Sequence, residues 1–144
     1  LDLALVSIED YRLNKLSTNS PDEFKLILEG FMIRGLSNFE NCIKDLSDRD
    51  DEAHQFNVVL DDLEKSIIAD WTAIMWLDKG INDTRQITSM LQNRNEAHRY
   101  SEANNLKAKA DHRVQMVEDV KHKQTTYSLK HADWKGWASG NYQL

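Results

Sequence analysis

Hydrophobic residues recur at intervals of three and four along most of the chain, which is the period of an amphipathic α-helix. A short first helix is predicted from Ser7 to Leu16. The clearest helix start follows at Ser20-Pro21-Asp22-Glu23, where a capping serine, a proline in the first turn and a glutamate at the third position form a capping box. Apolar positions then continue from Phe24 to Leu46, so we predict one core helix over residues 20–47.

Glycine and tryptophan positions refine this pattern. Gly30 and Gly35 lower the helix propensity of the predicted helix, which indicates either a close helix crossing or a local weakness. A third helix is predicted from about Phe56 to Leu77. Its Trp71 and Trp76 are five residues apart and cannot share one direction, so we expect one to face the core and the other a second neighbour.

Glycine also predicts the next boundary. Lys79-Gly80 is typical of a helix C-cap, and we expect a short helix from there to about Leu91. Residues 92–100 are polar and without period, which predicts a loop. Ser101 then caps a long last helix that ends at Lys130 or His131, with a narrow line of small apolar side chains similar to a coiled-coil seam.

The last residues, 132–144, have a different character, because two tryptophans and a tyrosine lie in a non-periodic segment that contains glycine. Such side chains are preferred interface anchors. We therefore predict an all-α bundle of four to five helices over residues 1–131, followed by an irregular aromatic tail over residues 132–144. The tail either folds back on its own helices or docks on a partner, and we favour docking. The docking candidates are Trp134, Trp137, Tyr142 and Tyr127.

Composition limits the protein class. The 144 residues suffice for one domain, and a single cysteine, Cys42, excludes an internal disulfide. Cys42 lies on the predicted apolar stripe, so we expect an inert, buried thiol. The longest uncharged apolar stretch, Trp71–Leu77, is far shorter than the roughly 20 residues that span a bilayer, and residues 1–6 lack the pattern of a secretory signal.

Charge is distributed unevenly. The net charge is −6, which argues against a general nucleic-acid binder, yet from Glu102 onward seven Lys and Arg outnumber five Asp and Glu. This asymmetry is compatible with a solvated monomer or with head-to-tail association of copies. An acidic loop follows the predicted core helix and is a candidate channel-lining or inter-subunit element. Its carboxylates are Asp48, Asp50, Asp51 and Glu52. An EF-hand starting at Asp48 fails, because Ala53 and Val59 occupy the positions that need glycine and glutamate.

Signatures of catalysis are missing from the sequence. It contains no phosphate-binding glycine loop, no HExxH or ExxH motif and no GxSxG elbow. The five histidines lack ligand spacing, and the pairing of Glu118 or Asp119 with His122 is typical of a surface ion pair. The lysines of the last helix project nearly all around it, so no basic face is expected. We therefore expect a non-enzymatic protein without cofactor or metal.

Dispersed apolar and capping positions over residues 56–127 carry a resemblance to a known group. They are Phe56-Asn57, Leu60, Leu63-Glu64, Ile67-Ile68, Trp76-Leu77, Ile81-Asn82, Tyr100-Ser101, Ala103-Asn104, Leu106-Lys107 and Tyr127. In these positions the chain resembles small helical virion proteins of tailed bacteriophages, which act in the neck as adaptor or head-completion proteins between portal and tail.

This resemblance implies a homo-oligomeric ring that assembles on the portal protein, extends the DNA channel without specific recognition of DNA, and docks the next neck or tail-completion protein. It implies a place in the virion neck, reached from the host cytoplasm during assembly and without membrane contact. The alternative is a cytoplasmic helical regulator or binding module, in which Met32, Met75 and Met90 would line an adaptable groove. An enzyme built on a helical bundle is the third, disfavoured class.

Overall fold

The protein is a mainly helical molecule, as predicted. The computed structural model describes residue 4, residues 18–90 and residues 96–138. Within these ranges it contains three long helices, a short helix and a two-stranded antiparallel hairpin; the sequence predicted a bundle of four to five helices. The elements are α3 (Pro21–Leu36), β1 (Arg49–Asp50), β2 (Gln55–Phe56), α4 (Asp62–Met90), α5 (Glu96–His131) and α6 (Trp134–Ala138). The helix predicted over residues 7–16 lies outside the described residues.

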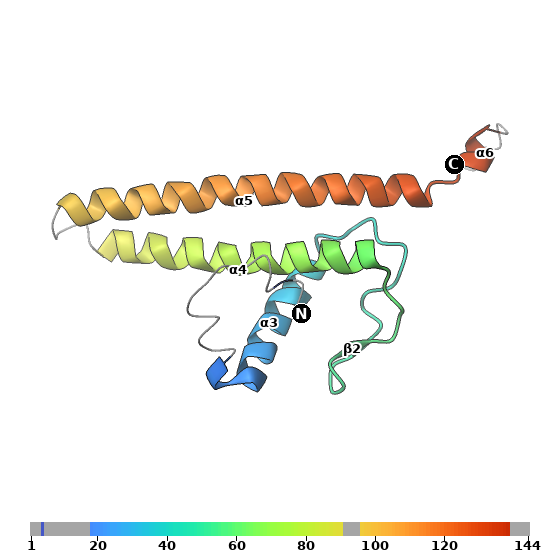
Figure 1. Cartoon of the computed structure of the whole chain (residues 1–144), viewed down its shortest axis with the longest axis horizontal. Coiled ribbons are helices and arrows are strands. Elements are labelled where there is room, and N and C mark those ends of the chain that lie inside the picture. Colours follow the sequence, from blue (N-terminus) through green and yellow to red (C-terminus); the bar gives the residue numbers. More distant parts are fainter. Residues whose placement is uncertain (1–3, 5–17, 91–95, 139–144) are drawn as a thin grey trace.

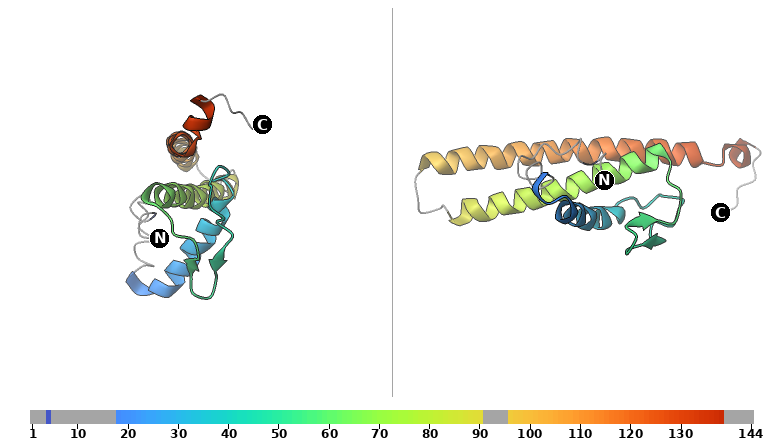
Figure 2. Two further views of the ribbon diagram at one scale, coloured as in Figure 1. Left: turned by 90° about the vertical axis from the view of Figure 1, so that its right-hand side faces the viewer. Right: turned by 60° about the horizontal axis from the view of Figure 1, so that its bottom comes forward.

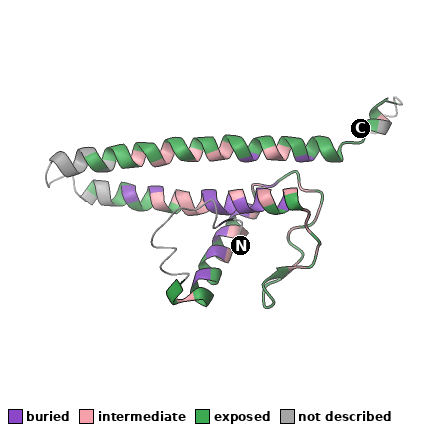
Figure 3. Cartoon of the chain, viewed as in Figure 1, coloured by how far each residue is buried: buried purple, intermediate pink, exposed green. Residues whose placement is uncertain are grey.

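Helix α4 is the central element. Helix α5 packs antiparallel along one side of α4, and α3 crosses the other side (Figure 1). Seen end-on, α4 separates α5 from α3 and the β-hairpin (Figure 2). Burial follows this order, since buried residues cluster on α3 and α4 while most of the surface of α5 is exposed (Figure 3). Among the described residues, no helix combines the length and the apolarity that are needed to cross a bilayer.

The core divides into two clusters along α4. One joins α4 to α3 through Phe24 and Leu28, and the other joins α4 to α5 through Val120 and Tyr127. The two tryptophans of α4 separate accordingly, as predicted. Trp71 is buried in the cluster with Tyr127, whereas Trp76 packs against the first cluster and places its ring edge-to-face on Phe31, with centroids 5.3 Å apart.

Helix α3 is shorter than the predicted helix 20–47. It begins at Pro21 with Ser20 as N-cap, as expected, but the hydroxyl of Ser20 makes no capping hydrogen bond, so the predicted capping box does not form. The helix ends at Leu36. A Cβ on Gly35 would lie 3.1 Å from the backbone carbon of Trp71, so this glycine allows the close crossing, whereas a Cβ on Gly30 would meet nothing.

The chain after α3 turns away from the helix axis to reach α5. Phe39 is buried there, and its ring packs on Tyr127 with centroids 5.1 Å apart. Cys42 follows in the same non-helical segment and is half-buried, whereas the sequence predicted a buried thiol on a helix. The apolar pattern therefore predicted the burial of Phe39 correctly, but the helix that it predicted beyond Leu36 does not form. Side chains in a turn can also reach the core, so apolar spacing alone does not require a continuous helix.

Helix α4 continues through the boundary predicted at Gly80. Lys79 and Asp83 form an ion pair of 2.6 Å one turn apart across this position, and the neighbouring Ile81 and Thr84 are buried. Burial of these side chains offsets the low helix propensity of one glycine, which is about 1 kcal/mol. Residues 96–100 belong to α5, although a loop was predicted over 92–100; residues 91–95 are outside the described residues. The predicted end at His131 is confirmed.

Candidate functional site: the end of α5 that carries the aromatic arm

Helix α6 forms a short arm beyond the C-terminal end of α5 (Figure 1). The indole N–H of Trp134 donates to the carbonyl of Leu129 at 2.8 Å, which ties the arm to the last turn of α5. The carboxylate of Asp133 accepts from the backbone N–H of Gly136 at 2.9 Å, and its carbonyl accepts from the N–H of Trp137 at 3.0 Å. The first part of the segment is therefore helical and tied to the end of α5, whereas an irregular tail was predicted over residues 132–144; residues 139–144 lie outside the described residues.

The two tryptophans of the arm remain largely open to solvent. The exposed fractions are 53% for Trp134 and 65% for Trp137. Their rings pack edge-to-face on each other, with centroids 6.4 Å apart and an interplanar angle of 83°. Two large aromatic side chains are thus held in a fixed relation with much of their apolar area unburied. Such preorganisation lowers the entropy cost of docking on a partner.

Other exposed apolar side chains occur at the same end of the molecule. Val59 lies shortly before α4 begins, Leu129 lies shortly before α5 ends, and the backbone N–H of Ile43 donates to Tyr127 of α5 at 3.2 Å. The exposed fractions are 87% for Val59, 52% for Leu129 and 62% for Ile43. We call these three residues, together with Trp134 and Trp137, the apolar end. Concentration of exposed apolar groups is a mark of interaction sites.

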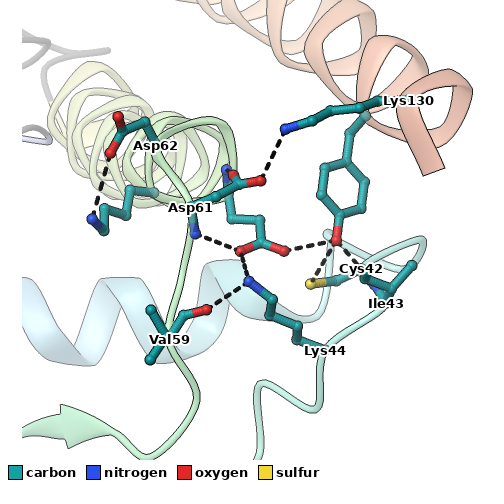
Figure 4. A network of polar contacts seen from close by, with 10 residues as sticks. Cys42, Ile43, Lys44, Val59, Asp61, Asp62 and Lys130 are labelled. Carbon is teal, nitrogen blue, oxygen red and sulfur yellow. Dashed lines mark hydrogen bonds and ion pairs between the residues drawn. The ribbon is translucent and has the colours of Figure 1, made fainter.

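A buried polar network lies beside Ile43 and Val59 of the apolar end (Figure 4). Its centre is Glu64, whose side chain is fully buried. One carboxylate oxygen accepts from Lys44 at 2.6 Å and from the backbone N–H of Asp61 at 2.7 Å, and the other accepts from the Tyr127 hydroxyl at 2.8 Å. The side chain of Asp61 in turn accepts from the N–H of Glu64 at 2.8 Å, which completes a capping box at the start of α4.

This network ties four chain segments together. Lys44 also donates to the carbonyl of Val59 at 2.6 Å, and Lys130 reaches Asp61 from α5 at 3.2 Å. The loop after α3, the chain before α4, the first turn of α4 and the last turns of α5 therefore meet at one point. A buried carboxylate is tolerated only when its oxygens are paired, so the network fixes the relative positions of the residues at the apolar end.

The bonds of the network stabilise one protonation state of each of its ionisable groups. Burial by itself raises the pKa of Glu64, but the bonds from Lys44, the Asp61 backbone and Tyr127 outweigh it and hold the pKa below its ordinary value. The backbone N–H of Glu64, followed by Lys130, lowers the pKa of Asp61. Burial, followed by the Glu64 carboxylate, raises the pKa of Tyr127 far above its usual range. The carboxylates stay charged and the phenol stays neutral around pH 7.

Charged side chains also link α4 to α5 along their length. The cations come from α5, and the carboxylates come from α4 in the pairs Arg113–Asp78 and Lys123–Asp70 and from the residue before α4 in the pair Lys130–Asp61. The excess of positive charge in the last part of the sequence therefore has a use within one chain, because it sets the register of two antiparallel helices. Charge asymmetry alone does not require association of copies.

The residues predicted from the sequence separate into three groups. Trp134 and Trp137 lie together on the exposed arm. Tyr127 is fully buried in the network and is not available to a partner. Tyr142 lies outside the described residues.

The predicted acidic loop forms the β-hairpin, and several of its carboxylates make local bonds. Asp50 accepts from the backbone N–H groups of Glu52 and Ala53 at 3.0 and 2.9 Å, and Asp51 pairs with Arg49 at 2.8 Å. Asp48 accepts from the side-chain amide of Asn57 at 2.7 Å. Within the described ranges, no three His, Cys, Asp or Glu side chains gather as metal ligands. The hairpin is thus a hydrogen-bonded turn with a strongly acidic outer surface.

Comparison with known proteins gives no relative: no protein-family model, no curated protein and no solved structure matches the chain. The site is therefore interpreted from its own geometry.

Sequence reasoning missed the role of Glu64, although a local signal was present. Asp61 and Glu64 have the spacing of a capping box directly before the apolar run of α4. That spacing predicts the helix start at Asp62 better than the apolar pattern does. It does not predict burial of Glu64, which depends on Lys44 and Tyr127, 20 and 63 residues away in the chain.

Proposed function

We propose that the protein is a non-enzymatic structural adaptor that docks on other protein subunits through its apolar end. The observation that carries this proposal is the exposure of two mutually packed tryptophans, Trp134 and Trp137, on an arm folded onto the end of α5. Unpartnered aromatic area of this kind is costly in water and is typical of interface anchors. The network around Glu64 supports the proposal, because it holds a rigid base behind the arm.

The specific setting that we propose is the neck of a tailed bacteriophage. There the chain would form a head-completion or adaptor ring between the portal protein and the next neck or tail-completion protein. The likeness of residues 56–127 to such virion proteins supports this setting. The net charge of −6 also suits a subunit beside a DNA channel, since it disfavours adhesion of the passing DNA.

A double variant tests the docking role. Trp134→Ala combined with Trp137→Ala should abolish capture of the partner subunit while far-UV circular dichroism remains that of the wild type. Val114→Ala is the matched control, because Val114 is also exposed, at 55%, but lies in the middle of α5. Wild-type capture by the double variant would refute the anchor role of the arm.

Crosslinking mass spectrometry on the native source material tests the setting. Links from Lys121 or Lys130 to a portal-like protein, together with links between copies of this chain, are expected for the neck adaptor. Links to one soluble cellular protein, without links between copies, would reject the neck adaptor and favour the regulatory module. The methionine groove of that module is partly accounted for by packing, since Met32 and Met75 lie against the core.

A further inference from the structure

An apolar cavity on the opposite side of α4 suggests which surface receives the arm. The cavity lies between α3, β2 and α4 and has a volume of about 220 Å³. Its apolar lining comes from α3, β2 and α4, from Leu60 just before α4, and from the buried Ala4 near the N-terminus; the apolar residues are Ala4, Met32, Phe56, Leu60, Ile68 and Ala69. Two polar side chains, Lys65 and Thr72, also line it.

The size and chemistry of this cavity suit an indole ring. An apolar protein cavity of roughly 150 Å³ accommodates benzene, so the larger volume here is sufficient for the two fused rings of tryptophan. Thr72 uses its hydroxyl proton in a 2.7 Å bond to the carbonyl of Ile68, which leaves its oxygen able to accept a further hydrogen bond. That oxygen can accept from an indole N–H.

The arm cannot fill the cavity of its own chain. Figures 1 and 2 show α6 beyond the end of α5, whereas α3 and the β-hairpin lie on the far side of α4. Helix α4 therefore lies between the arm and the cavity of the same chain. If the arm enters this cavity, the cavity belongs to another molecule.

Charge favours a second copy as that molecule. Phe56 connects the cavity to the β-hairpin, and residues 45–52 around the hairpin hold five carboxylates and one arginine. Residues 120–138, which include the arm, hold four lysines, two histidines and a single carboxylate, Asp133. Lys123 and Lys130 also serve the α4–α5 pairs, while Lys121 and His131 are exposed on α5. The region around the arm and the region around the cavity are thus complementary in charge.

We propose that Trp137 of one copy inserts into the cavity between α3, β2 and α4 of the next copy. This inference rests on the proposed docking function of the arm and names its partner. Trp137 is the inserting residue because it is the more exposed of the two tryptophans, while the Trp134 N–H is bonded to its own chain. The contact is head-to-tail, so its repetition produces a closed ring or an open filament.

Two variants of the full chain separate the halves of this contact. Trp137→Ala removes the inserted ring and leaves the cavity intact. Leu60→Trp fills the cavity and leaves the arm intact. Each variant alone should be monomeric in sedimentation velocity at concentrations at which the wild type associates, with self-association weakened at least about 30-fold, as for other tryptophan hot spots. Val114→Ala should associate as the wild type does.

Mixing the two variants gives the decisive result. Trp137→Ala still offers a cavity and Leu60→Trp still offers an arm, so the mixture should form 1:1 heterodimers and nothing larger. Circular dichroism of each variant checks its fold. If Leu60→Trp is misfolded, carbodiimide crosslinking of mixed ¹⁴N- and ¹⁵N-labelled wild-type protein replaces it. Links of Lys121 or Lys130 to the hairpin carboxylates Asp50 or Glu52 should then join light to heavy chains.

Several outcomes would overturn the inference. These are a wild-type chain that stays monomeric up to about 1 mM, wild-type association of Trp137→Ala, a mixture without heterodimers from two folded variants, or crosslinks confined to one isotope label. If Trp137→Ala associates normally but the double tryptophan variant loses partner capture, the inference fails and the proposed docking function stands. If neither assay responds, both fail.

Discussion

Substitution of Tyr127 by phenylalanine probes the polar network with little change in shape. The ring of Tyr127 is fully buried against Phe39 and would keep its packing. The lost hydroxyl donates to Glu64 at 2.8 Å and accepts from the backbone N–H of Ile43 at 3.2 Å. Removing one partner leaves a buried carboxylate oxygen and a backbone N–H without those bonds, which costs more than replacing the whole network by apolar groups.

The expected loss can be estimated from these two bonds. A hydrogen bond to a charged group contributes about 1.5–3 kcal/mol, and a neutral bond about 0.5–1.5 kcal/mol. We therefore expect Tyr127→Phe to lower the free energy of unfolding by about 2–4 kcal/mol. Domains of this size have a total stability of about 5–15 kcal/mol, so the loss is a large fraction. With a urea m-value of about 2 kcal/mol/M, the middle of the usual range for small proteins, the midpoint should fall by about 1–2 M.

Urea unfolding followed by far-UV circular dichroism measures this change. Thr126→Val is the matched control, because it removes a hydroxyl from the adjacent, exposed position of α5, where a change within about 0.5 kcal/mol is expected. A double-mutant cycle of Tyr127→Phe with Glu64→Gln should give a coupling above about 0.5 kcal/mol. A loss for Tyr127→Phe no larger than that of Thr126→Val would refute the stabilising role of the network.

Three further predictions follow from packing and ionisation. Gly35→Ala should cost about 1–3 kcal/mol in urea unfolding, because its methyl group would press on the α4 backbone, whereas Gly30→Ala meets open space and should gain about 0.5–1 kcal/mol; equal effects would exclude a tight crossing. The pKa values of Glu64 and Asp61 are lowered in the folded protein from the ordinary values of 4.5 and 3.8. Both carboxylates therefore stabilise the fold at a pH above these ordinary pKa values, and this stability should be lost as the pH falls through the lower pKa values of the folded protein. Glu64→Gln should reduce the fall in the free energy of unfolding at acidic pH. An unchanged fall would show that Glu64 does not cause it. The pKa of Tyr127 is raised above its ordinary 10.0, so stability that is fully present below pH 10 should be lost as the pH rises, and Tyr127→Phe should lack that loss.

Local sequence patterns predicted the fold class and several helix ends. Pro21 marks the start of α3 because proline suits the first turn, and His131 marks the end of α5 because the chain beyond it loses helical periodicity. The separate directions of Trp71 and Trp76 follow from the helical repeat of 3.6 residues. The local signals failed where a contact between distant segments decided the outcome. Gly80 is a strong stop signal in isolation, yet α4 passes through it because the side chains beyond it are buried.

The sequence by itself therefore determined that this chain forms amphipathic helices and carries an aromatic segment after the last of them. Tertiary structure alone decided which tryptophans are exposed and which of the aromatic docking candidates is buried in the core. Trp134 and Trp137 remain exposed because their arm lies beyond the end of α4. Tyr127 is buried, and its hydroxyl forms hydrogen bonds with Glu64 and Ile43 from distant segments of the chain. Periodicity and capping are properties of neighbouring residues. The pairing of a buried charge depends on side chains brought together only when the chain folds.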